Sequence, residues 1–176
     1  MTALEETTAW LEKAVIGLNL CPFSKAVHSK GQIRWVLCEA SDATGLLKLL
    51  VQELQLLAAS DPALVDTTLL VHPFVLCDFL TFNDFLDVAD RAVAQLGLEG
   101  VVQIASFHPG YRFADSDGDD DIANFSNRAP FPTLHLLRES SIDAAVAAFP
   151  DAADIYERNI ETLRRLGHAG WRRLWV

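Results

Sequence analysis

The stretch IASFHPGYRFADSDGDDDIANFSNRAPFPTLHLLRE, residues 104–139, begins and ends in strand-like apolar runs. Between these runs lies a long connection rich in His, Asp, Asn, Arg and aromatic residues. Connections of this length between core strands are uncommon, and they are usually either functional or disordered. Disordered segments are poor in aromatic residues, whereas this one holds Tyr111, Phe113, Phe125 and Phe131. The sequence therefore predicts a folded loop that carries an active site or a ligand-binding site.

The hydrophobic pattern on both sides of this loop predicts alternating helices and strands. Strands are expected at 33–39, 67–72, 101–107 and 133–139. Helices are expected at 2–19, 41–60, 81–97, 142–149 and 152–166. This order implies right-handed crossovers and parallel strands at the start of the sheet, and it leaves the direction of the fourth strand open. We therefore predict an α/β sandwich around a mixed, largely parallel sheet of about four strands, in a single domain over residues 1–176.

The composition narrows the class of protein. A chain of 176 residues, 51% of them hydrophobic, suits one domain with a substantial core. The net charge of −10 and a pI near 4.8 repel phosphate backbones and anionic membranes. No apolar run approaches the ~20 residues that span a bilayer, and the N-terminal segment has no basic region typical of a signal peptide. We expect a cytoplasmic protein that binds a small-molecule ligand and has no nucleic-acid or membrane partner. The sequence does not indicate its oligomeric state.

Three cysteines and the absence of common motifs exclude several chemistries. Cys21, Cys38 and Cys77 are odd in number and lack C-x-x-C spacing, so neither a disulfide framework nor a thiolate zinc site is indicated. Cys38 and Cys77 lie in apolar runs and are expected in the core, whereas Cys21 lies in a turn nearer the surface. The chain has no G-x-G-x-x-G, P-loop or G-x-S-x-G motif, which counts against dinucleotide binding, P-loop binding and a hydrolase elbow.

Two histidines share one sequence context. His72 ends the second expected strand and His108 ends the third, and each precedes a proline. Ligands of open α/β sheets bind beyond the carboxyl ends of parallel strands, so the two side chains would converge if these strands are parallel and adjacent. They are candidate catalytic residues, as general acid/base or as metal ligands, or they only mark strand ends. His135, in the middle of the fourth strand, faces away from its apolar neighbours and is either functional or solvated.

Five carboxylates are concentrated in the long loop, at Asp115, Asp117, Asp119, Asp120 and Asp121. Such a cluster repels itself unless solvent, arginines, amides or a cation offset the charge, and hard divalent cations prefer oxygen ligands of this type. Asp117, Asp119 and Asp121 are the candidate metal ligands, and a solvated acidic loop is the alternative. The EF-hand pattern does not fit the spacing.

The end of the loop offers groups that could bind a substrate. Arg128 presents a planar fork suited to carboxylate or phosphate, and Asn124 and Asn127 can both donate and accept hydrogen bonds. Together with Tyr111 they are the candidate substrate-binding residues. Arg128 is alternatively the internal counter-ion of the nearby aspartates.

Four segments of the chain resemble a known family. These are LNLCPFS at 18–24, LLVHP at 69–73, SFHPGYRF at 106–113 and ANFSNRAPFPTLHLLRE at 123–139. Together they resemble a bacterial family catalogued only as a domain of unknown function. The resemblance implies a single-domain, stand-alone bacterial protein, and it implies no activity, cofactor or catalytic residue.

Two functions are compatible with these patterns. The first is a metal-assisted hydrolase that acts on a small anionic molecule at a rim formed by His72, His108 and residues 115–128, with a divalent cation as its cofactor. The second is a non-catalytic small-molecule-binding or regulatory module that uses the same pocket. Whether the protein is an enzyme is left open.

Overall fold

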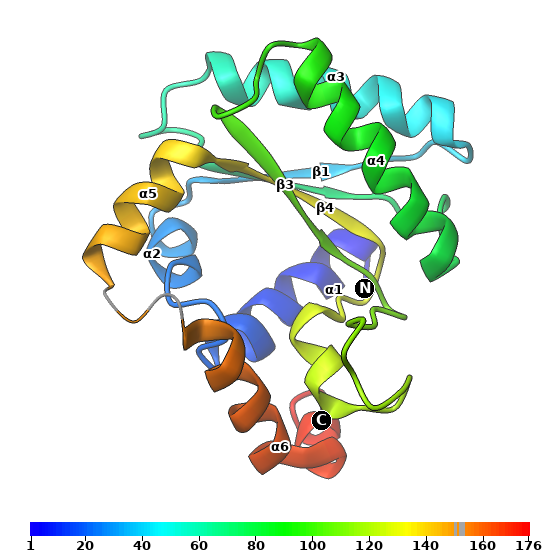
Figure 1. The fold of residues 1–176 in the computed structure, drawn as a ribbon, viewed down its shortest axis with the longest axis vertical. Coiled ribbons are helices and arrows are strands. Elements are labelled where there is room, and N and C mark those ends of the chain that lie inside the picture. The colour runs from blue at the N-terminus through cyan, green and yellow to red at the C-terminus, as the bar shows by residue number, and fades with distance from the viewer. Residues whose placement is uncertain (150, 152–153) are drawn as a thin grey trace.

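The architecture is a three-layer arrangement of helices around one sheet, seen in a computed structural model that describes residues 1–149, 151 and 154–176 (Figure 1). The sheet has four strands: β1 (Ile33–Leu37), β2 (Thr67–Val71), β3 (Val102–Phe107) and β4 (Thr133–Arg138). Their order is β1-β2-β4-β3. This confirms the predicted α/β fold with its mixed sheet of four strands.

Strand β4 is the one element whose direction was open. It pairs antiparallel with both β2 and β3, while β1 and β2 are parallel. Strands β1, β2 and β3 therefore point the same way, and β4 is inserted in the opposite direction between β2 and β3. The long loop before β4 makes this insertion feasible because it carries the chain from the end of β3 back to the same end of the sheet.

One face of the sheet is covered by α3 (Ala43–Ala59) and α4 (Phe79–Gln95). The sheet register places Leu70, Leu134 and Leu136 on this face, and all three are fully buried against these helices. Aspartates cap both helices. The Asp42 carboxylate accepts a hydrogen bond from the Gly45 amide and the Asp78 carboxylate accepts one from the Thr81 amide, so α4 begins two residues before the start expected at Thr81.

The opposite face is covered by α1 (Ala3–Trp10), η1 (Leu11–Ile16), α2 (Ser24–Ser29) and α5 (Glu139–Ala148) (Figure 1). The capping box expected at the N-terminus is present, because Thr2 and Glu5 exchange hydrogen bonds between their side chains and amides. The single long helix expected from there to residue 19 is interrupted, since η1 is a π-helix. Leu11 and Val15 of η1 are buried and face the sheet side of this layer.

The last helix, α6 (Ile155–Arg173), packs against the 3-10 helix η2 (Ile122–Asn127) in the long loop. Trp171 is buried beside Phe125, with ring centroids 5.2 Å apart. Gly167 has a φ of 66° and interrupts α6 where the sequence predicts a stop, but helical structure continues to Arg173. The break expected at Pro150 and the helix start expected at Ala152 lie outside the described residues.

The cysteines only partly follow the prediction. Cys38 is buried, and Cys21 is partly exposed. The expectation that Cys77 lies in the core is wrong, because Cys77 is exposed in the turn between β2 and α4. Of the helices in the described ranges, none is both long enough and apolar enough to cross a bilayer.

Candidate functional site

The two histidines that follow β2 and β3 lie at the same end of the sheet. Their strands point in the same direction but are not adjacent, because β4 lies between them. Both imidazole rings pack against Phe82 of α4, with centroid distances of 5.7 Å for His72 and 5.0 Å for His108. The predicted convergence at one rim therefore exists without strand adjacency.

Both rings are buried and hold the turns that follow their strands. Nδ1 of His72 lies 3.0 Å from the Val75 carbonyl oxygen. His108 uses both nitrogens, since Nε2 contacts the Leu76 carbonyl oxygen at 3.1 Å and Nδ1 accepts a hydrogen bond from the Gly110 amide. Burial lowers the pKa of His72 to about 4 and also lowers the pKa of His108. Both are therefore neutral near pH 7, and this geometry makes them anchors of the two turns.

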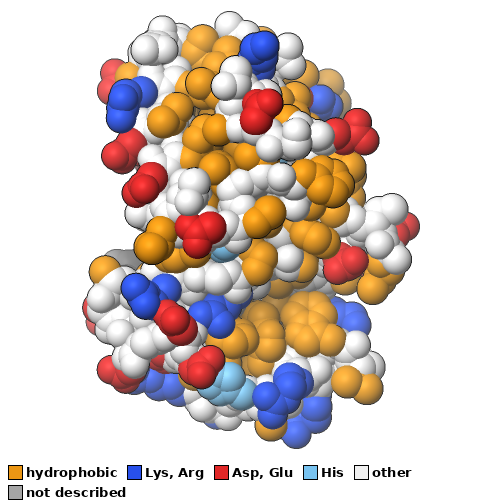
Figure 2. All heavy atoms as spheres, turned by 90° about the vertical axis from the view of Figure 1, so that its right-hand side faces the viewer, with side chains coloured by type: hydrophobic (Ala, Val, Ile, Leu, Met, Phe, Trp, Pro, Cys, Tyr) orange, Lys and Arg blue, Asp and Glu red, His pale blue; other side chains and the backbone are white. Residues whose placement is uncertain are grey.

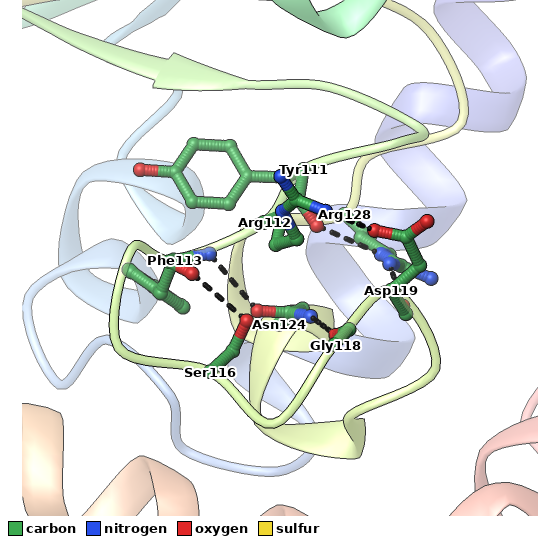
Figure 3. A network of polar contacts seen from close by, with 8 residues as sticks. All are labelled: Tyr111, Arg112, Phe113, Ser116, Gly118, Asp119, Asn124 and Arg128. Atoms are coloured by element: carbon green, nitrogen blue, oxygen red, sulfur yellow. Dashed lines mark hydrogen bonds and ion pairs between the residues drawn. The ribbon is translucent and has the colours of Figure 1, made fainter.

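The three aspartates predicted as metal ligands have separate environments, and Figure 3 shows that of Asp119. Asp121 caps η2 by accepting hydrogen bonds from the Ala123 and Asp117 amides, which lowers the pKa of its carboxyl group. Asp119 forms an exposed ion pair with Arg112, at 2.7 Å, and the Asp117 side chain is exposed. Over residues 1–149, 151 and 154–176, no group of three or more His, Cys, Asp or Glu is placed to hold a metal ion.

Arg128 contacts backbone oxygens rather than the aspartate carboxylates (Figure 3). Its Nε donates to the Tyr111 carbonyl oxygen at 3.1 Å, and its Nη2 donates to the carbonyl oxygen of Asp119. Its guanidinium carbon lies 4.5 Å from the centroid of the Phe125 ring. The alternative that Arg128 is the internal counter-ion of the aspartates stays a prediction, because the charges of Asp120 and Asp119 favour the charged form of Arg128 while its hydrogen bonds hold the loop together.

The other predicted substrate-binding residues also hold the loop together. Asn124 is fully buried: its Oδ1 accepts from the Phe113 amide and its Nδ2 donates to the Gly118 carbonyl oxygen (Figure 3). Asn127 donates to the Ser106 carbonyl oxygen at 3.4 Å. The half-buried ring of Tyr111 packs against Phe79, with centroids 5.3 Å apart. The sequence thus located an ordered, polar loop correctly, and the structure uses these groups to fold it.

A pocket of about 140 Å³ lies on the other face of the sheet. We call it the sheet pocket. Its floor is formed by residues of β1, β2, β3 and β4, and its cover by residues of α1, η1, α2 and α5. Most of its lining is apolar, and the main contributors are Trp10, Leu11, Val15, Phe23, Ile33 and Leu69. Cys21 lines it as well.

The polar centre of the sheet pocket is a pair of side chains on neighbouring strands. Thr67 of β2 and His135 of β4 both line the pocket, and Oγ1 of Thr67 lies 2.6 Å from Nε2 of His135. The same hydroxyl lies 2.7 Å from the Leu136 carbonyl oxygen. A carbonyl oxygen can only accept, so it takes the single hydroxyl proton and Nε2 of His135 must donate to Thr67. This fixes the proton on Nε2 and leaves Nδ1 of His135 as an acceptor.

That acceptor is open to the pocket. Burial lowers the pKa of His135 to about 4, so the ring is neutral near pH 7. Within the described part of the chain Nδ1 has no hydrogen-bond partner. The side-chain nitrogen and oxygen atoms that are both fully buried and without a partner are Trp10 Nε1, Thr68 Oγ1 and His72 Nε2, so Nδ1 of His135 is not one of them. An imidazole in an apolar chamber with one unpaired nitrogen can accept a hydrogen bond from a bound molecule.

A second polar pair lies at the same pocket. The Ser141 hydroxyl of α5 donates to the Asp66 carboxylate at 2.6 Å, and both residues line the cavity. Because the only hydroxyl proton of Ser141 is used in this bond, the pair also presents acceptor oxygens. One signal for this site was visible in the sequence, namely the polar His135 within an apolar strand. Its partner Thr67 was missed because the pairing of β2 with β4 joins residues 68 positions apart.

Comparison with known proteins gives a family but no activity. A family model described as "Protein of unknown function (DUF1415)" matches residues 2–173. Neither a curated protein nor a solved structure matches the chain significantly. The family match covers the sheet, both helical layers and the loop before β4, and it confirms the resemblance seen in the sequence. The chain therefore belongs to this family of unknown function.

Proposed function

We propose that this protein binds a small, mostly apolar molecule that carries one hydrogen-bond donor, and that the sheet pocket is the binding site. The observation that supports this most strongly is the open Nδ1 of a neutral His135 in an otherwise apolar chamber. Ligand sites are typically apolar cavities with a few polar groups that orient the ligand. The proposal keeps the binding-module hypothesis but moves the site from the His72/His108 rim to the opposite face of the sheet.

The size of the pocket limits the ligand. An engineered apolar cavity of about 150 Å³ in another protein binds benzene, and the sheet pocket measures about 140 Å³. A single ring therefore matches the space. The walls offer Trp10, Phe23 and Phe107 for aromatic contact.

The charges around the pocket favour a neutral donor over an anion. The described residues that line it include Asp66 but no Lys or Arg, so a carboxylate or phosphate entering it would lose its hydration without gaining a cation. His135 Nδ1 and the Asp66 carboxylate are both acceptors. A hydroxyl or N–H group on the ligand would satisfy them, and we name phenol-like molecules as the ligand class.

The metal-assisted hydrolase remains a prediction from the sequence. It requires a cation held near residues 115–128, where the three candidate aspartates have separate partners or face solvent. The binding proposal needs no metal and rests on a different set of residues.

The proposal is tested by comparing phenol with toluene, which has the same shape but no donor. Phenol should bind about fivefold more tightly, because one hydrogen bond contributes about 1 kcal/mol. In His135→Leu this preference should disappear while toluene still binds. Affinities can be measured by isothermal titration calorimetry, and the site located by chemical-shift changes of residues that line the sheet pocket.

Two variants of α5 control for the location. Ala145 lines the pocket, whereas Ala144 on the same helix is exposed. Ala145→Phe should abolish binding of both molecules, and Ala144→Phe should leave both affinities unchanged. Equal affinities of phenol and toluene for the unmodified protein, or an unchanged preference in His135→Leu, would refute the role of His135.

A further inference from the structure

A second cavity lies where the two ends of the chain meet. We call it the terminal cleft. Its volume is about 430 Å³, and the residues that matter for its chemistry are Glu6, Trp10, Phe125, Arg128, Trp171 and Trp175. Figure 2 views this side of the molecule and shows apolar side chains around a hollow, with Lys or Arg side chains beside it. The volume falls in the range of about 300–1,000 Å³ that is typical of small-molecule sites.

Aromatic rings make up much of the cleft wall. Phe125 and Trp171 lie edge to face at 5.2 Å, and Trp171 and Trp175 do so at 5.8 Å. Trp171 is buried, whereas Trp175 is 41% exposed at the edge of the cleft. Exposed tryptophan is unfavourable in water, and a flat apolar ligand against this wall would cover it.

Arg128 is a cation held in place at this wall. Two of its five N–H donors bind the backbone oxygens of Tyr111 and Asp119, and its guanidinium stacks on Phe125. In the described ranges Arg128 forms no direct ion pair: Asp120 and Asp119 act on its charge from a longer distance, and the Asp119 carboxylate is paired with Arg112. Three donors of a fixed, half-buried guanidinium are therefore left for another acceptor, and a carboxylate matches their geometry.

Among the described residues that line the cleft, Glu6 is the one acidic side chain. It lies near the start of α1 and is partly exposed, and no hydrogen bond of its carboxylate is seen among the described residues. Its carboxylate can therefore remain in water when a ligand binds. Arg128 cannot move away in the same manner, because its two backbone hydrogen bonds and the Phe125 ring fix it.

We propose that the terminal cleft is a second binding site, for an aromatic carboxylate whose ring lies against the tryptophan wall and whose carboxylate binds Arg128. This site is independent of the sheet pocket, whose acceptors disfavour an anion. Trp10 lines both cavities, but the anion-binding group is found in the terminal cleft alone among the described lining residues.

Three probes that share one ring system test the proposal: 2-naphthoate, 2-naphthamide and 2-naphthylmethylamine. Calorimetry should show naphthoate binding about tenfold more tightly than the amide, because a charge-assisted hydrogen bond contributes about 1.5–3 kcal/mol. Binding should also change the tryptophan fluorescence, since three of the four tryptophans line the cleft. Arg128→Met should remove the preference for naphthoate. Arg173→Met removes an exposed arginine at the C-terminal end of α6, and it should leave this preference unchanged.

Two further variants keep the test decisive. Trp175→Ala changes an exposed residue and should weaken all three probes even if Arg128→Met fails to fold. Ala145→Phe, which fills the sheet pocket, should leave naphthoate binding intact, and this separates the two sites. If naphthoate and naphthamide bind equally, or the amine binds most tightly, Arg128 does not select the ligand and the proposal is overturned. Loss of naphthoate binding in Ala145→Phe would also overturn it.

Discussion

Three histidines of this chain show how local partners decide the role of a side chain. His72 and His108 were chosen from sequence because each ends a strand before a proline, and that same context places their rings against the carbonyl oxygens of the following turns. His135 has no such local partner, so its Nδ1 stays open to the sheet pocket. The sequence marked all three residues, but it could not rank them, because the Thr67 hydroxyl that fixes the His135 tautomer comes from a distant strand.

The buried side chain of Asn124 should contribute strongly to the stability of the fold. Asn124→Ala should lower the free energy of unfolding by about 3 kcal/mol, because it leaves the Phe113 amide and the Gly118 carbonyl oxygen without their partner. Urea denaturation measures this. Asn127→Ala is the matched control and should cost less than about 1 kcal/mol, since Asn127 is only half-buried, its bond to the Ser106 carbonyl oxygen is 3.4 Å long, and its other partner is the hydroxyl of the neighbouring Ser126. If Asn124→Ala keeps full stability and instead loses ligand binding, the substrate-binding role predicted from sequence is correct.

At the scale of elements, periodicity predicted the strands well and their order not at all. All four strands lie within the predicted ranges, since each is a short apolar run with clear stop residues. The position of β4 between β2 and β3 depends on the path of residues 108–132, where η2 packs against α6 and no periodic pattern encodes that contact. The π-helix at Leu11–Ile16 was missed for a related reason, because its side chains show the same apolar stripe as an α-helix.

The acidic loop, Asp115 to Asp121, should not bind a divalent cation. We expect Mg²⁺ or Mn²⁺ to change the melting temperature no more than NaCl of equal ionic strength, because Asp119 is paired with Arg112 and Asp121 is used as the cap of η2. Asp121→Ala should lower the stability by about 1 kcal/mol through loss of that cap. Asp117→Ala should change it by less than about 0.5 kcal/mol, since the side chain is exposed. A melting-temperature rise that is specific to a divalent cation and absent in Asp119→Asn would restore the metal site.

For the molecule as a whole, the class of fold could be predicted from the sequence, whereas the two cavities could not. The core face of the sheet with α3 and α4 is built from the apolar stripes visible in the sequence. The sheet pocket instead draws on α1, η1, α2, all four strands and α5, and the terminal cleft joins α1 to the end of α6. Such sites exist only once distant segments are packed together. The same packing buries His72 on one face of the sheet and leaves His135 half-buried at the sheet pocket on the other face.

His72 and His135 predict how stability depends on pH. Burial lowers the pKa of each to about 4, whereas the value in an unfolded chain is about 6.5. Between these values the unfolded state binds more protons than the folded state, so the free energy of unfolding falls as the pH falls from about 6.5 toward 4. Each histidine contributes a slope of up to about 1.4 kcal/mol per pH unit between these values, and above about pH 6.5 it no longer destabilises the folded state.

Urea denaturation between about pH 7 and pH 4.5 measures this slope. His72→Asn retains a donor for the Val75 carbonyl oxygen, and His135→Gln retains one for Thr67, so each variant should keep the hydrogen bond and lose the titration. Each should flatten the pH dependence by about one proton, and the double variant by about two. A stability that stays constant from pH 7 to pH 5 in the unmodified protein would mean that these rings are solvated, and the open acceptor in the sheet pocket would then lose its physical basis.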